Sequence, residues 1–147
     1  MTTRTNTAPP PLLFLFSAIL TLFLVSACTD RVDHAHTCRR GKQVFAVGSN
    51  TPFTGIVSGR AREGYRRDPC TYEKQYKNGS LHGVARYWYP NGTLESKVPY
   101  ANGQINGVVT RYHPNGRLKA RLHFVNGMRG GSKGEMFWGA DGKRRKG

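Results

Sequence analysis

The chain has 147 residues and a formal net charge of +15, with 23 Lys and Arg against 8 Asp and Glu. Only one small domain fits in this length, which excludes multidomain architectures. So large an excess of cations ordinarily indicates a polyanionic partner.

The first 27 residues have the pattern of a helical export signal. Residues 1–11 carry one cation, Arg4, and no acid, and an uncharged apolar run of 14 residues follows from Leu12 to Val25. A membrane-spanning helix needs about 20 residues, so the run is short for one. It ends at Val25-Ser26-Ala27-Cys28, which resembles the bacterial lipobox. This resemblance implies that residues 1–27 are cleaved and that Cys28 is diacylated; an ordinary secretory signal or an anchoring helix is the alternative.

The expected lipid anchor determines the compartment and the available partners. The same resemblance implies that an Asp directly after the cysteine retains such proteins in the inner membrane, and here that position is Thr29. We therefore expect a lipid-anchored envelope protein, at the periplasmic face of the outer membrane if the cell has two membranes. An exported chain does not meet nucleic acid, so the expected polyanions are lipid headgroups, lipopolysaccharide or acidic wall polymers.

Residues 28–50 are expected to be the lipidated cysteine and a flexible tether. Within them Asp33, His34, His36 and Cys38 form an Asp-His-x-His-x-Cys cluster with nitrogen, oxygen and sulfur ligands that a metal ion uses. No second ligand cluster follows, and polar residues near an anchor usually form a tether. We therefore expect neither a metal site nor a cofactor.

Two cysteines remain once Cys28 is acylated. Cys38 and Cys70 are an even pair in an oxidising compartment, which favours one disulfide between them. Two unpaired thiols are the open alternative, because connectivity is not visible in a sequence.

The second half of the chain is dominated by Asn-Gly pairs, which begin at Asn78, Asn91, Asn102, Asn115 and Asn126. Their spacings alternate between 13 and 11 residues and so define a 24-residue repeat. Asn-Gly between alternating apolar runs predicts a β-hairpin, because the type I′ turn needs positive φ at two successive positions. The repeat therefore predicts an all-β chain of hairpins.

An aromatic residue and a glycine frame each repeat. Tyr76, Tyr100 and Phe124 each precede an Asn-Gly pair by two residues, and Gly83 and Gly107 follow at a fixed distance. Further upstream, Phe53-Thr-Gly55 with Gly59 has the glycine spacing of a first repeat, while Asp141-Gly142 replaces the last Pro-Asn-Gly two residues late. Atypical terminal repeats are expected because they cap the stack.

This frame resembles the MORN-variant repeat family over roughly residues 53–142. The resemblance implies an elongated antiparallel meander of about four stacked hairpins, here residues 51–142, followed by a basic tail at 143–147. The family is a scaffold class with diverse roles, and its bacterial members are often labelled as antitoxin components. It implies a fold and almost no chemistry.

The two faces of the sheet are expected to differ. In the second strand of the hairpins, Leu118, Ala120, Leu122 and Phe124 alternate with Arg117, Lys119, Arg121 and His123, so one side is apolar and the other is wet. We interpret the aromatic residues as core packing rather than as a ligand cage.

The cations are the sharpest candidate for a binding site. Arg117, Lys119 and Arg121 share one strand face, Arg111 lies on the neighbouring strand, and Lys143 to Lys146 form the tail. They are predicted to contact an anionic surface, and a solvated face that keeps the sheet soluble is the alternative.

No catalytic set is expected. The carboxylates are scattered, none recurs at an equivalent repeat position, and no Ser-His-Asp framework is present. We expect a non-catalytic binding or scaffolding surface, with a protein, lipopolysaccharide or wall polymer as the partner and the oligomeric state left open. The alternative is an antitoxin or immunity protein that masks a toxin.

Overall fold

The structure is a computed structural model, and it describes residues 30–61, 70–130 and 134–145. The predicted signal peptide, Cys28 and residues 63–69 of the first repeat lie outside the described residues. Within those three ranges the chain is all-β apart from one 3-10 turn, η1 (His34–His36), as the sequence predicts. No helix in these ranges is long and apolar enough to cross a membrane.

The strands follow the repeat. They are β1 (Arg31–Asp33), β2 (Thr37–Arg40), β3 (Gln43–Ala46), β4 (Gly55–Ala61), β5 (Cys70–Lys77), β6 (Ser80–Leu81), β7 (Gly83–Trp88), β8 (Leu94–Ala101), β9 (Gln104–Ile105), β10 (Gly107–Tyr112), β11 (Leu118–Val125), β12 (Met128–Arg129), β13 (Met136–Trp138) and β14 (Arg144–Arg145).

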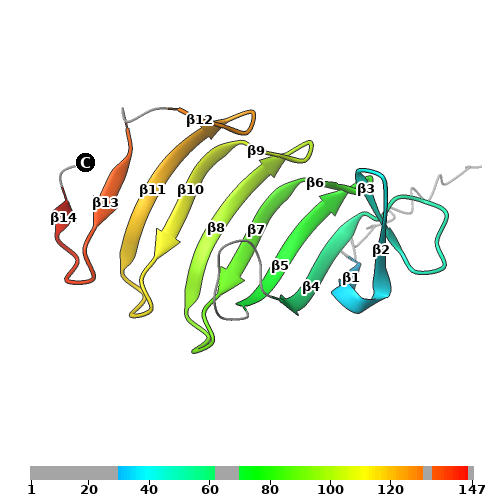
Figure 1. Ribbon diagram of the computed structural model, residues 1–147, viewed down its shortest axis with the longest axis horizontal. Helices are drawn as coiled ribbons and strands as arrows, with labels where there is room; N and C mark the ends of the chain where they lie inside the picture. The colour runs from blue at the N-terminus through cyan, green and yellow to red at the C-terminus, as the bar shows by residue number, and fades with distance from the viewer. Residues whose placement is uncertain (1–29, 62–69, 131–133, 146–147) are drawn as a thin grey trace, which may run out of the picture.

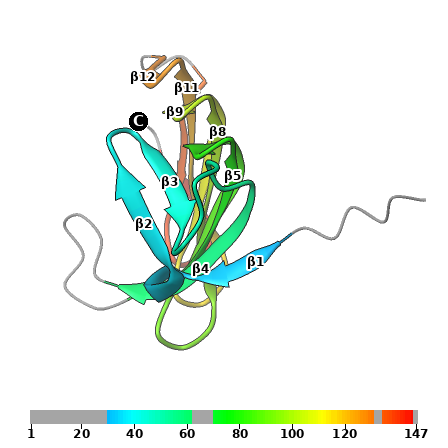
Figure 2. The same cartoon turned by 90° about the vertical axis from the view of Figure 1, so that its right-hand side faces the viewer.

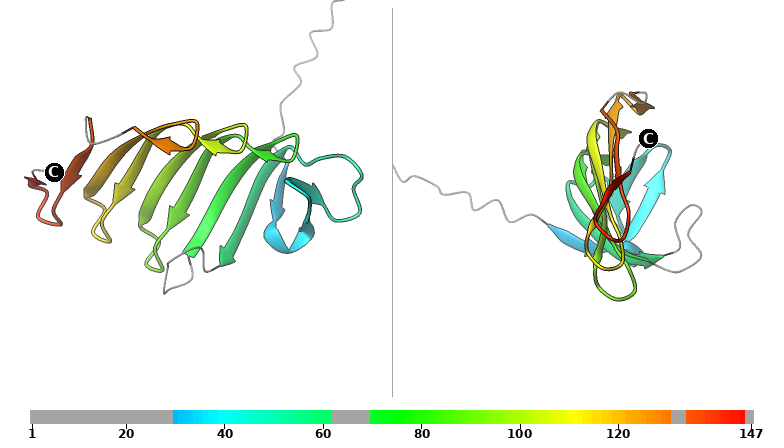
Figure 3. Two further views of the ribbon diagram at one scale, coloured as in Figure 1. Left: turned by 45° about the horizontal axis from the view of Figure 1, so that its top comes forward. Right: turned by 90° about the vertical axis from the view of Figure 1, so that its left-hand side faces the viewer.

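One long sheet contains all of these strands except β2 and β3. Its order is β1-β4-β5-β7-β8-β10-β11-β13-β14, with the short strands β6, β9 and β12 continuing the turns at one edge (Figure 1). From β4 onward every pair is antiparallel, so the predicted meander of hairpins is confirmed, whereas β1 pairs with β4 in parallel. Successive hairpins lie side by side along the length of the sheet (Figure 3).

The segment expected to be a tether, residues 28–50, is instead largely folded, and the expectation is wrong. It contains β1, η1 and the hairpin β2–β3, which stands on one side of the long sheet (Figure 2). The reason is apolar burial: Val44 of β3 is 7% exposed and packs with Phe53 and Val57 against the first strand of the repeats. The few apolar residues of this stretch indicate a linker locally, and the packing that folds it is non-local.

The Asn-Gly pairs form two kinds of turn at the two edges of the sheet. Asn78, Asn102 and Asn126 have φ near +50° and are followed by glycines with positive φ, which is the predicted type I′ geometry. At Asn91 and Asn115 only the following glycine has positive φ, so the type I′ prediction is wrong there. In these turns the glycine N–H donates to the residue three positions earlier, as Gly92 does to Tyr89 at 2.9 Å. A proline at the first central position, with φ fixed near −65°, excludes the type I′ turn, and the absence of positive φ at Asn91 and Asn115 selects type I over type II.

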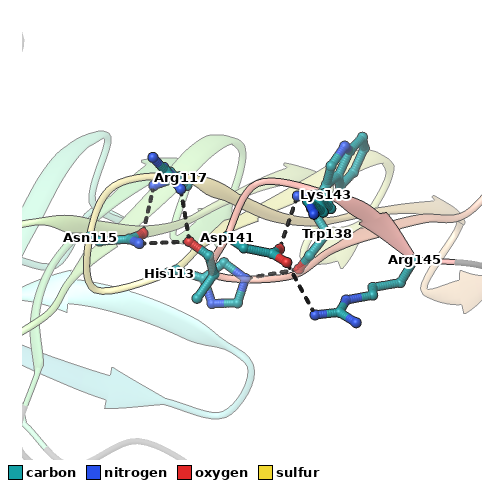
Figure 4. A network of polar contacts seen from close by, with 8 residues as sticks. His113, Asn115, Arg117, Trp138, Asp141, Lys143 and Arg145 are labelled. Carbon is teal, nitrogen blue, oxygen red and sulfur yellow. Dashed lines mark hydrogen bonds and ion pairs between the residues drawn. The ribbon is translucent and has the colours of Figure 1, made fainter.

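Hydrogen bonds between successive repeats run along both edges. At the type I′ edge the glycine N–H donates to a carbonyl of the preceding repeat, as in Gly103 to Leu81 and Gly127 to Ile105, each at 2.8 Å. At the other edge the asparagine side chain donates to the following repeat: Asn91 to Pro114 at 3.1 Å and Asn115 to Ala140 at 2.9 Å (Figure 4). Each repeat is thus held at its two ends as well as by its strand ladder.

The apolar face is the side of the sheet that carries the buried residues. It includes Tyr72, Ala85, Tyr87, Ser96, Val109 and Ala120, all 8% exposed or less. The framing aromatics lie on this face, each directly opposite a glycine: Tyr76 faces Gly55, Tyr100 faces Gly83 and Phe124 faces Gly107. Gly55, Gly83 and Gly107 have positive φ of +152°, +92° and +114°, a backbone conformation that other residues rarely adopt, which accounts for the glycine of the frame.

Candidate binding surface

The opposite side of the sheet, which we call the basic face, carries a row of polar residues in register. Along β11 the side chains of Lys119, Arg121 and His123 are exposed, while their alternate neighbours are buried or half-buried. Arg121 pairs with Thr110, and Thr110 pairs on its other side with Lys97. This confirms the prediction that the second strand of the hairpin has one solvent-exposed side and one apolar side.

The row continues across the next hairpin. Lys97 pairs directly with Arg86, and Arg86 pairs with Glu73, so one acid and three cations lie along five neighbouring strands. Glu73 is ion-paired with Arg31 of β1. The Glu73 carboxylate therefore has a cation on each side, Arg86 and Arg31, and it lies at one end of the row.

Arg86 and Lys97 are like charges placed opposite each other across an antiparallel pair. Cβ atoms in such pairs are about 4.5–5.5 Å apart, and a like-charge pair is destabilising relative to a neutral one. An anion bound between the two side chains would remove this repulsion.

The structure divides the four cations that the sequence groups together. Arg111 pairs with Ala120, which is 4% exposed and lies on the apolar face, and directly paired residues share a face. Arg111 therefore lies on the opposite side of the sheet from Lys119 and Arg121, and its assignment to their patch is wrong. The signal was in the sequence, because Arg111 occupies the repeat position of Tyr87, which is buried on the apolar face.

Arg117 lies at the edge of the sheet rather than in the row. It precedes β11, and its guanidinium donates to the carbonyl of Ala140 at 3.3 Å in the next turn (Figure 4). Lys143 to Arg145 of the predicted basic tail belong to the last hairpin, in which Arg144 pairs with Trp138. Arg144 lies on the side of the basic face, because its partner Trp138 shares that side with Met136, the partner of Arg121. Arg145 pairs with Phe137, the partner of Ala120, and so lies on the apolar face.

Arg86 and Lys97 are the members of the surface that the sequence reading missed as site residues. Neither belongs to a run of cations, and each has a neutral or acidic neighbour along the chain. Only the register of β7 against β8 makes them a pair. Predicting a cross-strand pair from a sequence requires the positions of both the hairpin turn and any bulge. Here a bulge shifts the register at Tyr87/Trp88.

The two other candidate sites take different roles in the structure. No disulfide joins Cys38 and Cys70, so that expectation is corrected. Cys38 pairs with Phe45 and so lies on the side of the hairpin away from Val44, which packs on the sheet, while Cys70 is buried with Tyr72, Ala85 and Tyr87.

In the Asp-His-x-His-x-Cys segment, the Asp33 carboxylate caps η1 by accepting from Ala35 N–H at 2.8 Å, and the His34 ring packs edge-on against Tyr72. Among the described residues no group of three or more His, Cys, Asp or Glu side chains is placed to share a metal ion.

Comparison with protein families gives one match. Residues 81–102 and 105–126 each match the MORN repeat variant, and they correspond to two adjacent repeats of the sheet. Comparisons with curated proteins and with solved structures gave no match. The family match supports the repeat and its hairpins, and it falls on the part of the sheet that contains Arg86, Lys97 and Arg121.

Proposed function

We propose that the protein is a lipid-anchored envelope component whose repeat sheet binds anionic surfaces through its basic face. The observation that carries the proposal is the in-register row of Arg86, Lys97 and Arg121, in which the paired acid, Glu73, is already ion-paired with Arg31. The proposal assigns no reaction to the chain; binding is the function.

The anchor is proposed at Cys28, from the lipobox-like Val25-Ser26-Ala27-Cys28. Only Thr29 and Asp30 separate this cysteine from β1, the first strand of the long sheet. An acylated Cys28 would therefore hold the β1 end of the sheet close to the membrane. Each cation near an anionic membrane contributes about 1 kcal/mol, and acyl chains contribute about 0.8 kcal/mol per buried CH₂, so the lipid provides attachment and the cations provide orientation or recognition.

Co-sedimentation tests the basic face separately from the anchor. The chain from Thr29 onward, which lacks the lipid and contains every described residue, would be mixed with neutral vesicles, anionic vesicles and lipopolysaccharide across a salt series. Binding to the anionic particles that weakens with salt is expected, because exposed charges are screened within about 8–10 Å at physiological ionic strength.

A pair of variants with equal net charge identifies the surface. Changing Lys97, Lys119 and Arg121 to Ser should abolish most of the binding, while changing Arg40, Arg111 and Arg145 to Ser removes the same charge elsewhere and should have a small effect. Equal losses in the two variants would mean that net charge alone drives association. Absence of binding at low salt would refute the proposal and leave solubility as the role of the cations.

Acylation of Cys28 is tested by a separate experiment. Metabolic labelling with a palmitate analogue should label the full chain and fail to label Cys28→Ser. Labelling of that variant would contradict the proposed anchor without bearing on the basic face.

A further inference from the structure

A second polar site lies between the hairpin β2–β3 and the type I′ edge of the sheet. Here a cavity of about 440 Å³ opens between the turn of the hairpin, at Gly41 and Lys42, and the turns at Gly79 and Gly103. It belongs to the side of the sheet that carries the apolar face, because Tyr76, which lines it, is paired with Gly55 on that face. The site is thus separate from the basic face.

The cavity is lined by hydrogen-bond donors without a carboxylate. Arg39 and Lys42 supply two cations from the hairpin, and the polar residues Ser80, Asn102 and Gln104 line the cavity from the sheet edge. Guanidinium and ammonium groups combined with neutral donors suit a phosphate, which offers several acceptor oxygens and up to two negative charges.

The walls of the cavity are fixed by hydrogen bonds that leave its donors available. The N–H of Val44 donates to Gly79 at 2.9 Å, and the Gln43 side chain donates to the carbonyl of Asn78 at 3.1 Å, which ties the hairpin to the first turn. The second turn is held because Gly103 N–H donates to Leu81. A site formed in advance in this way loses little conformational entropy on binding.

A neighbouring cavity of about 330 Å³ extends the site toward the middle of the sheet. It shares Arg39, Val44 and Tyr76 with the first cavity and adds Tyr72 and Lys74. The Lys74 ammonium lies 4.4 Å from the centroid of the Tyr72 ring, so a further cation and an aromatic wall stand beside the shared residues. This extension would accept the uncharged body of a ligand.

We propose that this groove binds a small molecule that carries a phosphate group, with the phosphate at Arg39 and Lys42 and the rest of the molecule along Tyr76 and Tyr72. The two cations come from a hairpin outside the MORN-matching residues, so the site is a feature of this chain rather than of the repeat. The inference does not rest on the proposed function of the basic face.

Nuclear magnetic resonance of the full chain in a neutral detergent tests the site with three probes: inorganic phosphate, glycerol 3-phosphate and a short-chain phosphatidylglycerol below its micelle concentration. Saturable shifts are expected at the backbone amides of Gly41, Gly79 and Gly103. Tighter binding of glycerol 3-phosphate would identify a soluble ligand, and tighter binding of the phosphatidylglycerol would identify a lipid headgroup; either supports a phosphate site.

Two variants and one control decide the outcome. Arg39→Gln with Lys42→Gln should weaken binding about tenfold or more, since charge-assisted hydrogen bonds are lost. Asn102→Gly removes one amide while keeping a residue that accepts φ of +51°, and it should weaken binding without unfolding the turn. Lys97→Gln with Lys119→Gln makes the same charge change on the basic face and should leave the shifts intact. Chemical-shift changes that do not saturate, the absence of such changes, or an equal loss of affinity in the control variant would overturn the proposal. This holds whatever the vesicle assays show.

Discussion

The side-chain amide of Asn115 donates a hydrogen bond of 2.9 Å to the carbonyl oxygen of Ala140, which belongs to the next hairpin (Figure 4). Asn91 makes the equivalent bond to Pro114 one repeat earlier. At the last turn the residue is Asp141, whose carboxylate accepts from Lys143 N–H and forms an ion pair with Arg145 within its own hairpin. The donor that links repeats is present where a following repeat is described and is replaced at the last described turn.

Asn115→Asp is therefore expected to loosen the last hairpin. The carboxylate cannot donate to Ala140 and would face a carbonyl oxygen, so we expect a loss of about 0.5–1.5 kcal/mol in the free energy of unfolding. Urea denaturation measures the change. Asp141→Asn is the matched control, since it adds a donor where no later hairpin follows among the described residues, and it should alter stability by less. A loss as large in the control would show that the missing donor to the next hairpin is not the cause, since the two substitutions change the charge in opposite directions.

Substitutions of Asn102 should separate backbone strain from hydrogen bonding. Asn102 has φ of +51°, so Asn102→Ala is expected to destabilise by about 1–2 kcal/mol, whereas Asn102→Gly should be close to neutral. At Asn91, where φ is not positive, the difference between Ala and Gly should be smaller. Thermal unfolding of the four variants checks this, and equal costs of Ala at the two asparagines would contradict the two turn types.

Lys97→Glu should stabilise the sheet and weaken its binding. It converts the like-charge pair with Arg86 into an opposite-charge pair, for which we expect a gain of about 0.2–1 kcal/mol. The same change removes a cation from the centre of the basic face, so co-sedimentation with anionic vesicles should fall. A variant that is more stable and binds as well as the native chain would place the binding surface elsewhere.

The ion pair between β12 and β13 should be visible as a pH effect. Arg129 contacts Glu135 through Nε at 2.5 Å and Nη2 at 2.6 Å, and these hydrogen bonds together with the positive charge hold the pKa of the Glu135 carboxyl below its ordinary value. A lowered pKa in the folded chain gives stability that is present above the ordinary pKa and is lost as pH falls through the lowered one. Carbon-detected titration should show Glu135 titrating low, and Arg129→Gln should return its pKa toward the ordinary value. An unchanged pKa in that variant would assign the shift to another cause.

The repeat was predictable because its signals are local. The 24-residue period, the hairpins and the apolar side of β11 follow from turn residues and alternation alone. The turn type at Asn91 and Asn115 is also encoded locally, since Pro90 and Pro114 exclude positive φ at the first central position of the turn.

Non-local contacts account for the rest. The hairpin β2–β3 is stabilised because Val44 packs with Val57 and Phe53, and no local pattern in residues 37–46 indicates these contacts. The parallel pairing of β1 with β4 likewise has no turn to signal it. The Arg86–Lys97 pair depends on a strand register that shifts by one residue at a bulge. Because of this shift, simple alternation of residues predicts the wrong partners across the two strands.

Asp141 also bears on how such a sheet changes in length over evolution. A duplicated 24-residue unit inserted before Asp141 would carry an asparagine able to link to the unit after it, and the final turn would still close the array. A unit added beyond Asp141 would meet a carboxylate with no proton to donate. Growth of the array is therefore expected by internal duplication, which leaves its two atypical ends in place.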